Sequence, residues 1–400
     1  MPPSVTGAVD RTTSYYGDPV TVTGSLSRPA TGGTVPLAGA TVQVLETVSG
    51  RIVQLGSTVT GIDGGIRTVV HPISSGTISL SLPAATGWTA ASTVLGPLTV
   101  LIPGTTLTAV ADRSDVGYAD AVTVSGTLIR DAGGTDTPLA KAVVSIRSTT
   151  AAGAVSTLGS ATVAADGSWS ATVHPRLAGT LTAVYAGGPG LPAAGAVAGS
   201  VTVGTWTTAL TLTAQYSQLT AGAADPVSGT VSRSYAGLTS NAPAVPVNLY
   251  LVNTLGTATL LRTVTTTAAG SFSTTVAPLE NGSLIARVVS VAGYANADST
   301  LVAVAVASKL TITGSTVTTG GRPASVVVQL TVGRVAPVVI QELVGGSWQP
   351  VASTSTGSTG RGTLSLAGMS LGTHALRASF DGDSRGGGAV SGTLWVSVGS

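Results

Sequence analysis

The stretch "VDRTTSYYGDPVTVTGSL" (9–26) decides the fold, because it returns 102 positions later as "ADRSDVGYADAVTVSGTL" (111–128). A second segment is found four times: "IDGGIRTVVHPISSGTISL" (62–80), "ADGSWSATVHPRLAGTLTA" (165–183), "AAGSFSTTVAPLENGSLIA" (268–286) and "TGRGTLSLAGMSLGTHAL" (359–376). Similarity at a fixed spacing is the signature of a repeat architecture. We therefore predict four copies of one unit. Their bounds are residues 1–103, 104–205, 206–307 and 308–400.

Each copy has the sequence pattern of short β-strands. "VTVTGSL" (20–26) alternates apolar and polar residues with the period of a half-buried strand. Val42 and Val44 should face one way, and Val144 with Ile146 and Val247 with Leu249 occupy the same places. The Asp-Gly of "ADGSW" (165–169) favours a tight hairpin turn. About seven short strands per copy predict an all-β sandwich.

Two further positions recur. The residue after the tight turn is large in the first three copies (Ile66, Trp169 and Phe272), so it should close one end of the core. In the fourth copy Gly362 occupies this plug position, and Trp348 is our candidate for filling the space. One glycine is predicted to be common to all copies; its positions are Gly76, Gly179, Gly282 and Gly372.

Composition excludes several classes of protein. The net charge of +2 arises from 18 basic and 16 acidic residues that form no basic run, so no nucleic-acid partner is expected. The absence of cysteine excludes disulfides and thiolate metal sites. No apolar stretch reaches the ~20 residues that a transmembrane helix requires, so no membrane insertion is expected.

The last copy, "GTHALRASFDGDSRGGGAVSGTLWVSV" (372–398), resembles the carboxyl-terminal half of bacterial Ig-like repeat domains. The shared features are the Gly-Thr-His start, an aromatic residue, a Gly-Asp-Ser loop and a last strand rich in Thr and Val. The resemblance implies four tandem immunoglobulin-like β-sandwich domains. Because the joints between copies are short, we expect these domains to form an elongated rod. Similar domains occur in stalks of bacterial surface proteins and on phage capsids and tails.

The sequence predicts no catalytic residue, no cofactor and no metal site. Asp381 and Asp383 are the candidate cation ligands in the last loop, but two acids are few for calcium, and we interpret the loop as a polar turn. Three tryptophans are candidate surface contacts: Trp348, Trp395 and Trp206. Trp206 follows a predicted joint and is expected to wedge the second and third copies together.

These features predict a non-enzymatic structural or adhesive protein. Because no secretory signal follows Met1, the favoured hypothesis is a phage virion component: a tail fibre, or a tail- or capsid-decorating protein. The alternatives are the stalk of a secreted bacterial cell-surface adhesin and an array of carbohydrate-binding modules. The expected partners are other virion or surface-assembly proteins in a multimeric assembly, and a host cell-surface glycan.

Overall fold

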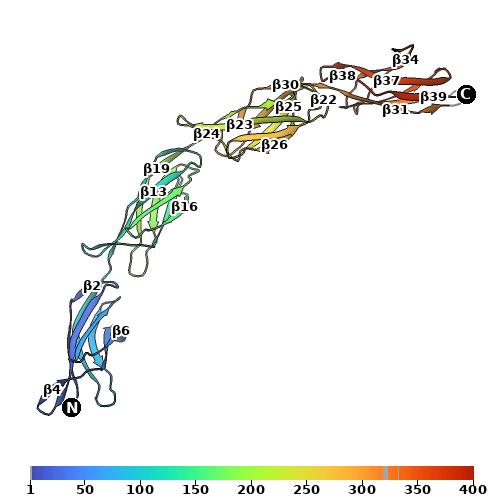
Figure 1. Cartoon of the computed structure of the whole chain (residues 1–400). Coiled ribbons are helices and arrows are strands. Elements are labelled where there is room, and N and C mark those ends of the chain that lie inside the picture. Colours follow the sequence, from blue (N-terminus) through green and yellow to red (C-terminus); the bar gives the residue numbers. More distant parts are fainter. Residues whose placement is uncertain (1, 319–322, 332) are drawn as a thin grey trace. The chain divides into compact units, whose positions relative to one another are not determined.

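The computed structural model describes residues 2–318, 323–331 and 333–400, and these residues are all-β, with no helix. Figure 1 shows the strands along the chain. Contacts divide the chain into two compact units, Met1–Val203 and Gly204–Ser400. Each unit is described by itself, and the elongated rod stays a prediction. Among the described residues, no helix is long and apolar enough to cross a bilayer.

The first unit contains nineteen strands. Those of the first repeat are β1 (Ser4–Val9), β2 (Thr13–Tyr15), β3 (Val20–Ala30), β4 (Gly33–Pro36), β5 (Thr41–Val48), β6 (Arg51–Val59), β7 (Gly65–Val70), β8 (Gly76–Leu82) and β9 (Ala91–Leu101). Those of the second repeat are β10 (Gly104–Leu107), β11 (Val110–Ala111), β12 (Asp115–Gly117), β13 (Val122–Asp131), β14 (Asp136–Pro138), β15 (Val143–Thr149), β16 (Val155–Thr162), β17 (Ser168–Val173), β18 (Gly179–Tyr185) and β19 (Ala194–Gly204).

The second unit contains the remaining strands. Those of the third repeat are β20 (Thr207–Leu210), β21 (Thr213–Ala214), β22 (Gln218–Thr220), β23 (Asp225–Tyr235), β24 (Leu238–Asn241), β25 (Pro246–Asn253), β26 (Ala258–Thr265), β27 (Ser271–Val276), β28 (Gly282–Val288), β29 (Ala297–Asp298) and β30 (Val302–Ala307). Those of the fourth repeat are β31 (Lys309–Gly314), β32 (Val317–Thr318), β33 (Ala324–Thr331), β34 (Pro337–Val344), β35 (Ser347–Ser355), β36 (Arg361–Leu366), β37 (Gly372–Asp383), β38 (Gly386–Val390) and β39 (Leu394–Val398).

The first repeat shows the sandwich topology that the others share. One sheet places β3 between β1 and β7, and the second sheet has the order β2-β9-β8-β5-β6. All pairs are antiparallel except β2 with β9, which is parallel. Two such sheets, with the chain passing from one to the other between β1 and β2, form an immunoglobulin-like sandwich.

The repeated opening motif explains how the chain crosses between sheets. Asp10 lies between β1 and β2, and its Oδ1 accepts a hydrogen bond from the backbone N–H of Thr21 in β3 at 3.0 Å. Asp112 does the same for Thr123 at 2.9 Å. Arg11 donates a hydrogen bond to the Asp10 carboxylate, and this bond is the largest cause of the lowered pKa of Asp10. The Asp-Arg pair therefore fixes the crossing.

Four clusters of buried hydrophobic residues form the cores, and each lies within one predicted repeat. The predicted inward pairs are confirmed: Val42, Val44, Val144, Ile146 and Val247 are fully buried. Large residues at the plug position are also buried, as predicted; Ile66, Trp169 and Phe272 are each 3% exposed.

In the fourth repeat the space at the plug position is filled from the opposite strand. Gly362 pairs with Val328, whereas in the first three repeats the large residue pairs with a glycine, as Trp169 does with Gly126. Val328 is fully buried, and a Cβ at Gly362 would meet it at 3.1 Å. The expectation that Trp348 fills this space is wrong, because Trp348 lies on the outer face of the sheet.

The proposed glycine series is also corrected by the strand register. In β8, Leu80 pairs with Val44 and Gly76 lies four residues before it. In β37, Ala378 pairs with Ile340, so His374 occupies the place of Gly76, and Gly372 lies two residues earlier. In the first repeat a Cβ at Gly76 would lie 2.6 Å from the side chain of Glu46, whose burial raises its pKa. The fourth repeat has a histidine there, bonded to the corresponding acid, Glu342.

Candidate functional site

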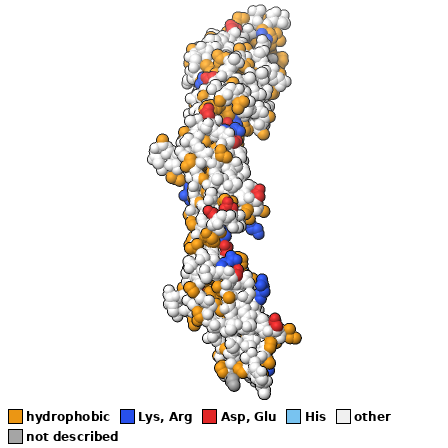
Figure 2. Space-filling view, turned by 90° about the vertical axis from the view of Figure 1, so that its left-hand side faces the viewer, with side chains coloured by type: hydrophobic (Ala, Val, Ile, Leu, Met, Phe, Trp, Pro, Cys, Tyr) orange, Lys and Arg blue, Asp and Glu red, His pale blue; other side chains and the backbone are white. Residues whose placement is uncertain are grey.

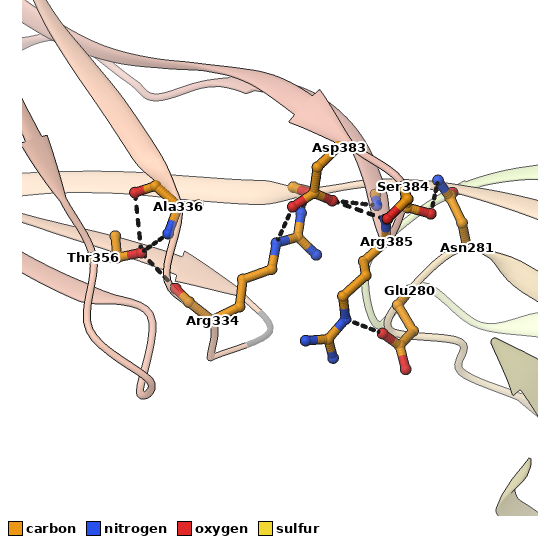
Figure 3. Close-up of polar contacts among 10 residues, drawn as sticks. Glu280, Asn281, Arg334, Ala336, Thr356, Asp383, Ser384 and Arg385 are labelled. Carbon is orange, nitrogen blue, oxygen red and sulfur yellow. Dashed lines mark hydrogen bonds and ion pairs between the residues drawn. The ribbon is translucent and has the colours of Figure 1, made fainter. Parts of the chain in front are cut away.

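The loop of Asp381 and Asp383, which we interpreted from the sequence as a polar turn, forms the joint between the third and fourth repeats (Figure 3). The hairpin of β37 and β38 reaches back to the third repeat, where Gly387 pairs with Ala307 of β30. The backbone N–H of Ser308 donates to the Gly387 carbonyl at 3.0 Å, and that of Asn281 donates to the Arg385 carbonyl at 2.7 Å. The sheets of the two repeats are thereby joined through hydrogen bonds.

One ion pair crosses this joint, and a second, within the fourth repeat, supports the loop that forms it. Arg385 Nε donates to Glu280 Oε2 at 2.6 Å, and Asn253 Nδ2 donates to the other oxygen of Glu280 at 3.1 Å. Arg334 Nε lies 3.0 Å from Asp383 Oδ2, while Arg334 Nη2 donates to Ser308 at 3.1 Å. Glu280 and Arg334 are buried, so these pairs are shielded from solvent more than ordinary surface pairs.

The position that Arg334 occupies in the fourth repeat is held by a buried apolar residue in the first and third repeats. The hydroxyl of Thr356 donates to the carbonyl of Arg334, as Thr60 does to Leu37 and Thr266 to Ala242. The guanidinium lies 5.1 Å from the centre of the Phe380 ring. Burial is the largest cause of the lowered pKa of Arg334. An arginine in place of an apolar residue is a signal in the sequence, but its partner Asp383 could not be found without the fold.

The candidate cation ligands in this loop differ in their surroundings. Asp383 Oδ1 accepts the backbone N–H groups of Arg385 and Gly386 at 2.8 and 3.1 Å, and its Oδ2 faces Arg334. Asp381 is exposed. The carboxylate of Asp383 is therefore used to shape the turn and to bind an arginine. Across the described parts of the chain, no cluster of three or more His, Asp or Glu side chains could hold a metal ion.

The first and second repeats have a different joint. Arg130 Nη2 donates to Asp18 Oδ1 at 2.7 Å, and the guanidinium carbon of Arg130 lies 6.0 Å from the centre of the Tyr15 ring. The ring of Tyr16 packs so closely on Gly190 that a Cβ there would lie 2.1 Å from it. Each unit thus fixes its two repeats through an arginine–carboxylate pair, although the residues come from different places in the repeat.

The nearest approach to a catalytic arrangement is in the fourth repeat. His374 Nδ1 lies 2.5 Å from Glu342 Oε1, beside a cavity of about 460 Å³ that Ser370 and Met369 also line. His374 Nε2 donates to the backbone carbonyl of Ser370 at 2.8 Å. A nitrogen that donates to a carbonyl cannot also accept the proton of a serine hydroxyl, so this set lacks the geometry of a serine nucleophile and its base.

The His374–Glu342 pair should make the stability of the fourth repeat depend on pH. The hydrogen bond to the Glu342 carboxylate is the largest cause of the raised pKa of His374. A histidine whose pKa is higher in the folded state contributes its full stabilisation of the fold below its unfolded pKa of about 6.5. This contribution is lost as pH rises through the folded pKa. We expect His374→Asn to flatten the decline in the free energy of unfolding between pH 6.5 and 9. Denaturant unfolding at both pH values measures this, with His71→Asn in the first repeat as control. An unchanged decline in His374→Asn would contradict it.

The three candidate surface tryptophans have different environments. Trp395 is 59% exposed, in β39. Trp348 is half-buried in β35, and the guanidinium of Arg377 lies 4.3 Å from the centre of its ring. Trp206 is only 3% exposed, with Arg233 4.2 Å above it and Tyr235 against its edge. Burial removes Trp206 from the candidate surface contacts.

No protein-family model and no curated protein matches the sequence. Among solved structures, the chain is similar to invasin, a bacterial integrin-binding protein, with 15% identity, a TM-score of 0.30, and 99% of this chain and 79% of that one covered. It is similar to the Escherichia coli adhesin FdeC, with 19% identity, a TM-score of 0.25, and 76% and 96% covered. It is also similar to native E. coli alpha-2-macroglobulin, with 10% identity and a TM-score of 0.24. The match covers 99% of this chain, which spans only 32% of the length of that protein. Likeness at this level carries no functional argument.

Proposed function

We propose that this chain is a non-enzymatic structural and adhesive protein of the bacterial cell surface, in which tandem Ig-like sandwiches hold a binding surface away from the cell. The observation that carries the proposal is the joint between the third and fourth repeats. The Glu280–Arg385 pair and shared backbone hydrogen bonds connect these repeats, and the Arg334–Asp383 pair, within the fourth repeat, supports the loop that makes the contact. A joint of this kind resists bending, which suits a spacer and serves no obvious purpose in an enzyme.

The surface composition supports the same role. Charged residues make up 8% of the chain, and Figure 2 shows them thinly scattered over the face drawn. Low charge limits long-range attraction to polyanions such as nucleic acids. Adhesion would then depend on local groups, and the exposed Trp395 is one of them.

The test is the location of the protein in its native source. Surface biotinylation of intact cells followed by mass spectrometry should recover the chain with the cell-surface proteins. Mass spectrometry of purified virions is the matched measurement. Recovery in virions, in stoichiometric amounts and without cell-surface labelling, would overturn the cell-surface proposal and establish the virion hypothesis.

A further inference from the structure

One outer face of the fourth repeat carries a set of side chains that the core and the joint do not use. It belongs to the sheet β39-β37-β34-β35. We call it the aromatic face. Its residues are Gln341, Leu343, Trp348, Ala375, Arg377 and Trp395.

The strand register places both tryptophans on one row across the sheet. Trp395 pairs with Ala375, and Leu343 pairs with Trp348. Because Glu342 pairs with Leu376, the next residues along, Leu343 and Ala375, are neighbours in the same antiparallel register. The indoles thus stand three strand spacings apart, about 14 Å, with Ala375 and Leu343 between them.

Arg377 is held flat on this face. Its Nε donates to Gln341 Oε1 at 2.7 Å, and its guanidinium covers the Trp348 ring at 4.3 Å. Among the described residues, no hydrogen-bond partner is found for Nη1 or Nη2. These two nitrogens can therefore bind a carboxylate, and the stacked guanidinium loses little conformational entropy in doing so.

The charges around Arg377 favour an anionic ligand. Glu342, the acid on the adjacent strand, turns away from this face to bind His374. Asp381 lies further along β37, beyond the stretch that pairs with β34. Arg377 is thus not neutralised by an acid within the aromatic face.

We propose that the aromatic face binds an acidic polysaccharide whose sugars carry carboxylates. The exposed indole of Trp395 stacks against the apolar face of a pyranose ring, and Arg377 pairs with the carboxylate of a neighbouring sugar. A polysaccharide fits better than an acidic peptide, because the 59% exposed indole of Trp395 offers a flat aromatic platform of the kind on which a sugar ring stacks. This site goes beyond the proposed function, since it applies wherever the protein is located.

The test is isothermal titration calorimetry of the full chain with polygalacturonate as probe and dextran as its neutral counterpart. We expect binding of polygalacturonate only, weakening as salt increases. Trp395→Ala and Arg377→Gln should each weaken binding at least tenfold, and Arg377→Lys should not preserve it, because lysine lacks the planar fork. Circular dichroism checks that each variant is folded.

The matched controls lie in the first repeat. Val94→Ala removes an exposed apolar side chain, 69% exposed, from the corresponding sheet, and Arg67→Gln removes an exposed cation. Both should bind as the wild type does. Absence of polygalacturonate binding, wild-type affinity in either Trp395→Ala or Arg377→Gln, or binding of poly-L-glutamate as tight as that of polygalacturonate would each overturn the proposal. None of these outcomes bears on where the protein is located.

Discussion

Trp169→Ala is expected to lower the free energy of unfolding of the second repeat by about 3–5 kcal/mol, the usual cost of removing a fully packed aromatic side chain. Trp169 is 3% exposed in the core cluster of that repeat. Gly126 pairs with it, and a Cβ there would lie 3.0 Å from the indole, so the neighbouring strand cannot easily fill the space left behind. Scanning calorimetry of the full chain should show one transition moving down while the others stay.

Two variants serve as controls for this prediction. Trp169→Phe should cost much less, because Phe272 fills the same position in the third repeat and the indole N–H of Trp169 has no partner among the described residues. Trp395→Ala makes the same chemical change at an exposed site, where substitutions usually alter stability by less than about 0.5 kcal/mol. Equal losses in Trp169→Ala and Trp395→Ala would contradict the role of Trp169 in closing the core.

Asp383→Ala is expected to lower the free energy of unfolding of the fourth repeat by about 2–3 kcal/mol and to loosen the loop that contacts the third repeat. The variant leaves the guanidinium of Arg334, 5% exposed, without its ion pair, and an unpaired buried charge is costly. The loss should fall below that of a fully buried pair because the side chain of Asp383 is 37% exposed. The same change removes the acceptor of two backbone N–H groups in the turn.

Asp381→Ala is the matched control, since it removes an exposed acid two residues away that forms no hydrogen bond or ion pair with the described part of the third repeat. Chemical denaturation should show lower stability of the fourth repeat in Asp383→Ala only. Hydrogen exchange should show faster exchange at Ser308 and Asn281, whose N–H groups donate to the hairpin of β37 and β38. Equal behaviour of the two variants would contradict a structural role for Asp383.

Much of each sandwich could be predicted because its signals are local. The alternation in "VTVTGSL" placed Val20 and Val22 in the core, and both are fully buried. The tight turn before Trp169 placed that side chain at the plug position. These signals depend on residues within one strand or one turn, and repetition showed them more than once.

The predictions that the structure corrects concern positions where side chains from two different strands fill the same part of the core. Gly362 looked like a gap, but the missing volume is supplied by Val328, which precedes it by more than thirty residues. His374 is buried beside Glu342, which lies 32 residues earlier in the chain. Volume and charge at such positions are properties of a pair, and the sequence does not show which residues form the pair.

The sequence by itself determined the all-β class, the repeated segments and the inward residues of strands such as β5 and β15, because the period of a strand is set by neighbouring residues. Only the tertiary structure decided what the closing loop does. Glu280 and Arg385 lie 105 positions apart and meet at 2.6 Å because the hairpin of the fourth repeat folds back onto the third. The same folding turned Glu342 inward and left Arg377 and Trp395 on one open face, since strand register assigns side chains to the two sides of a sheet.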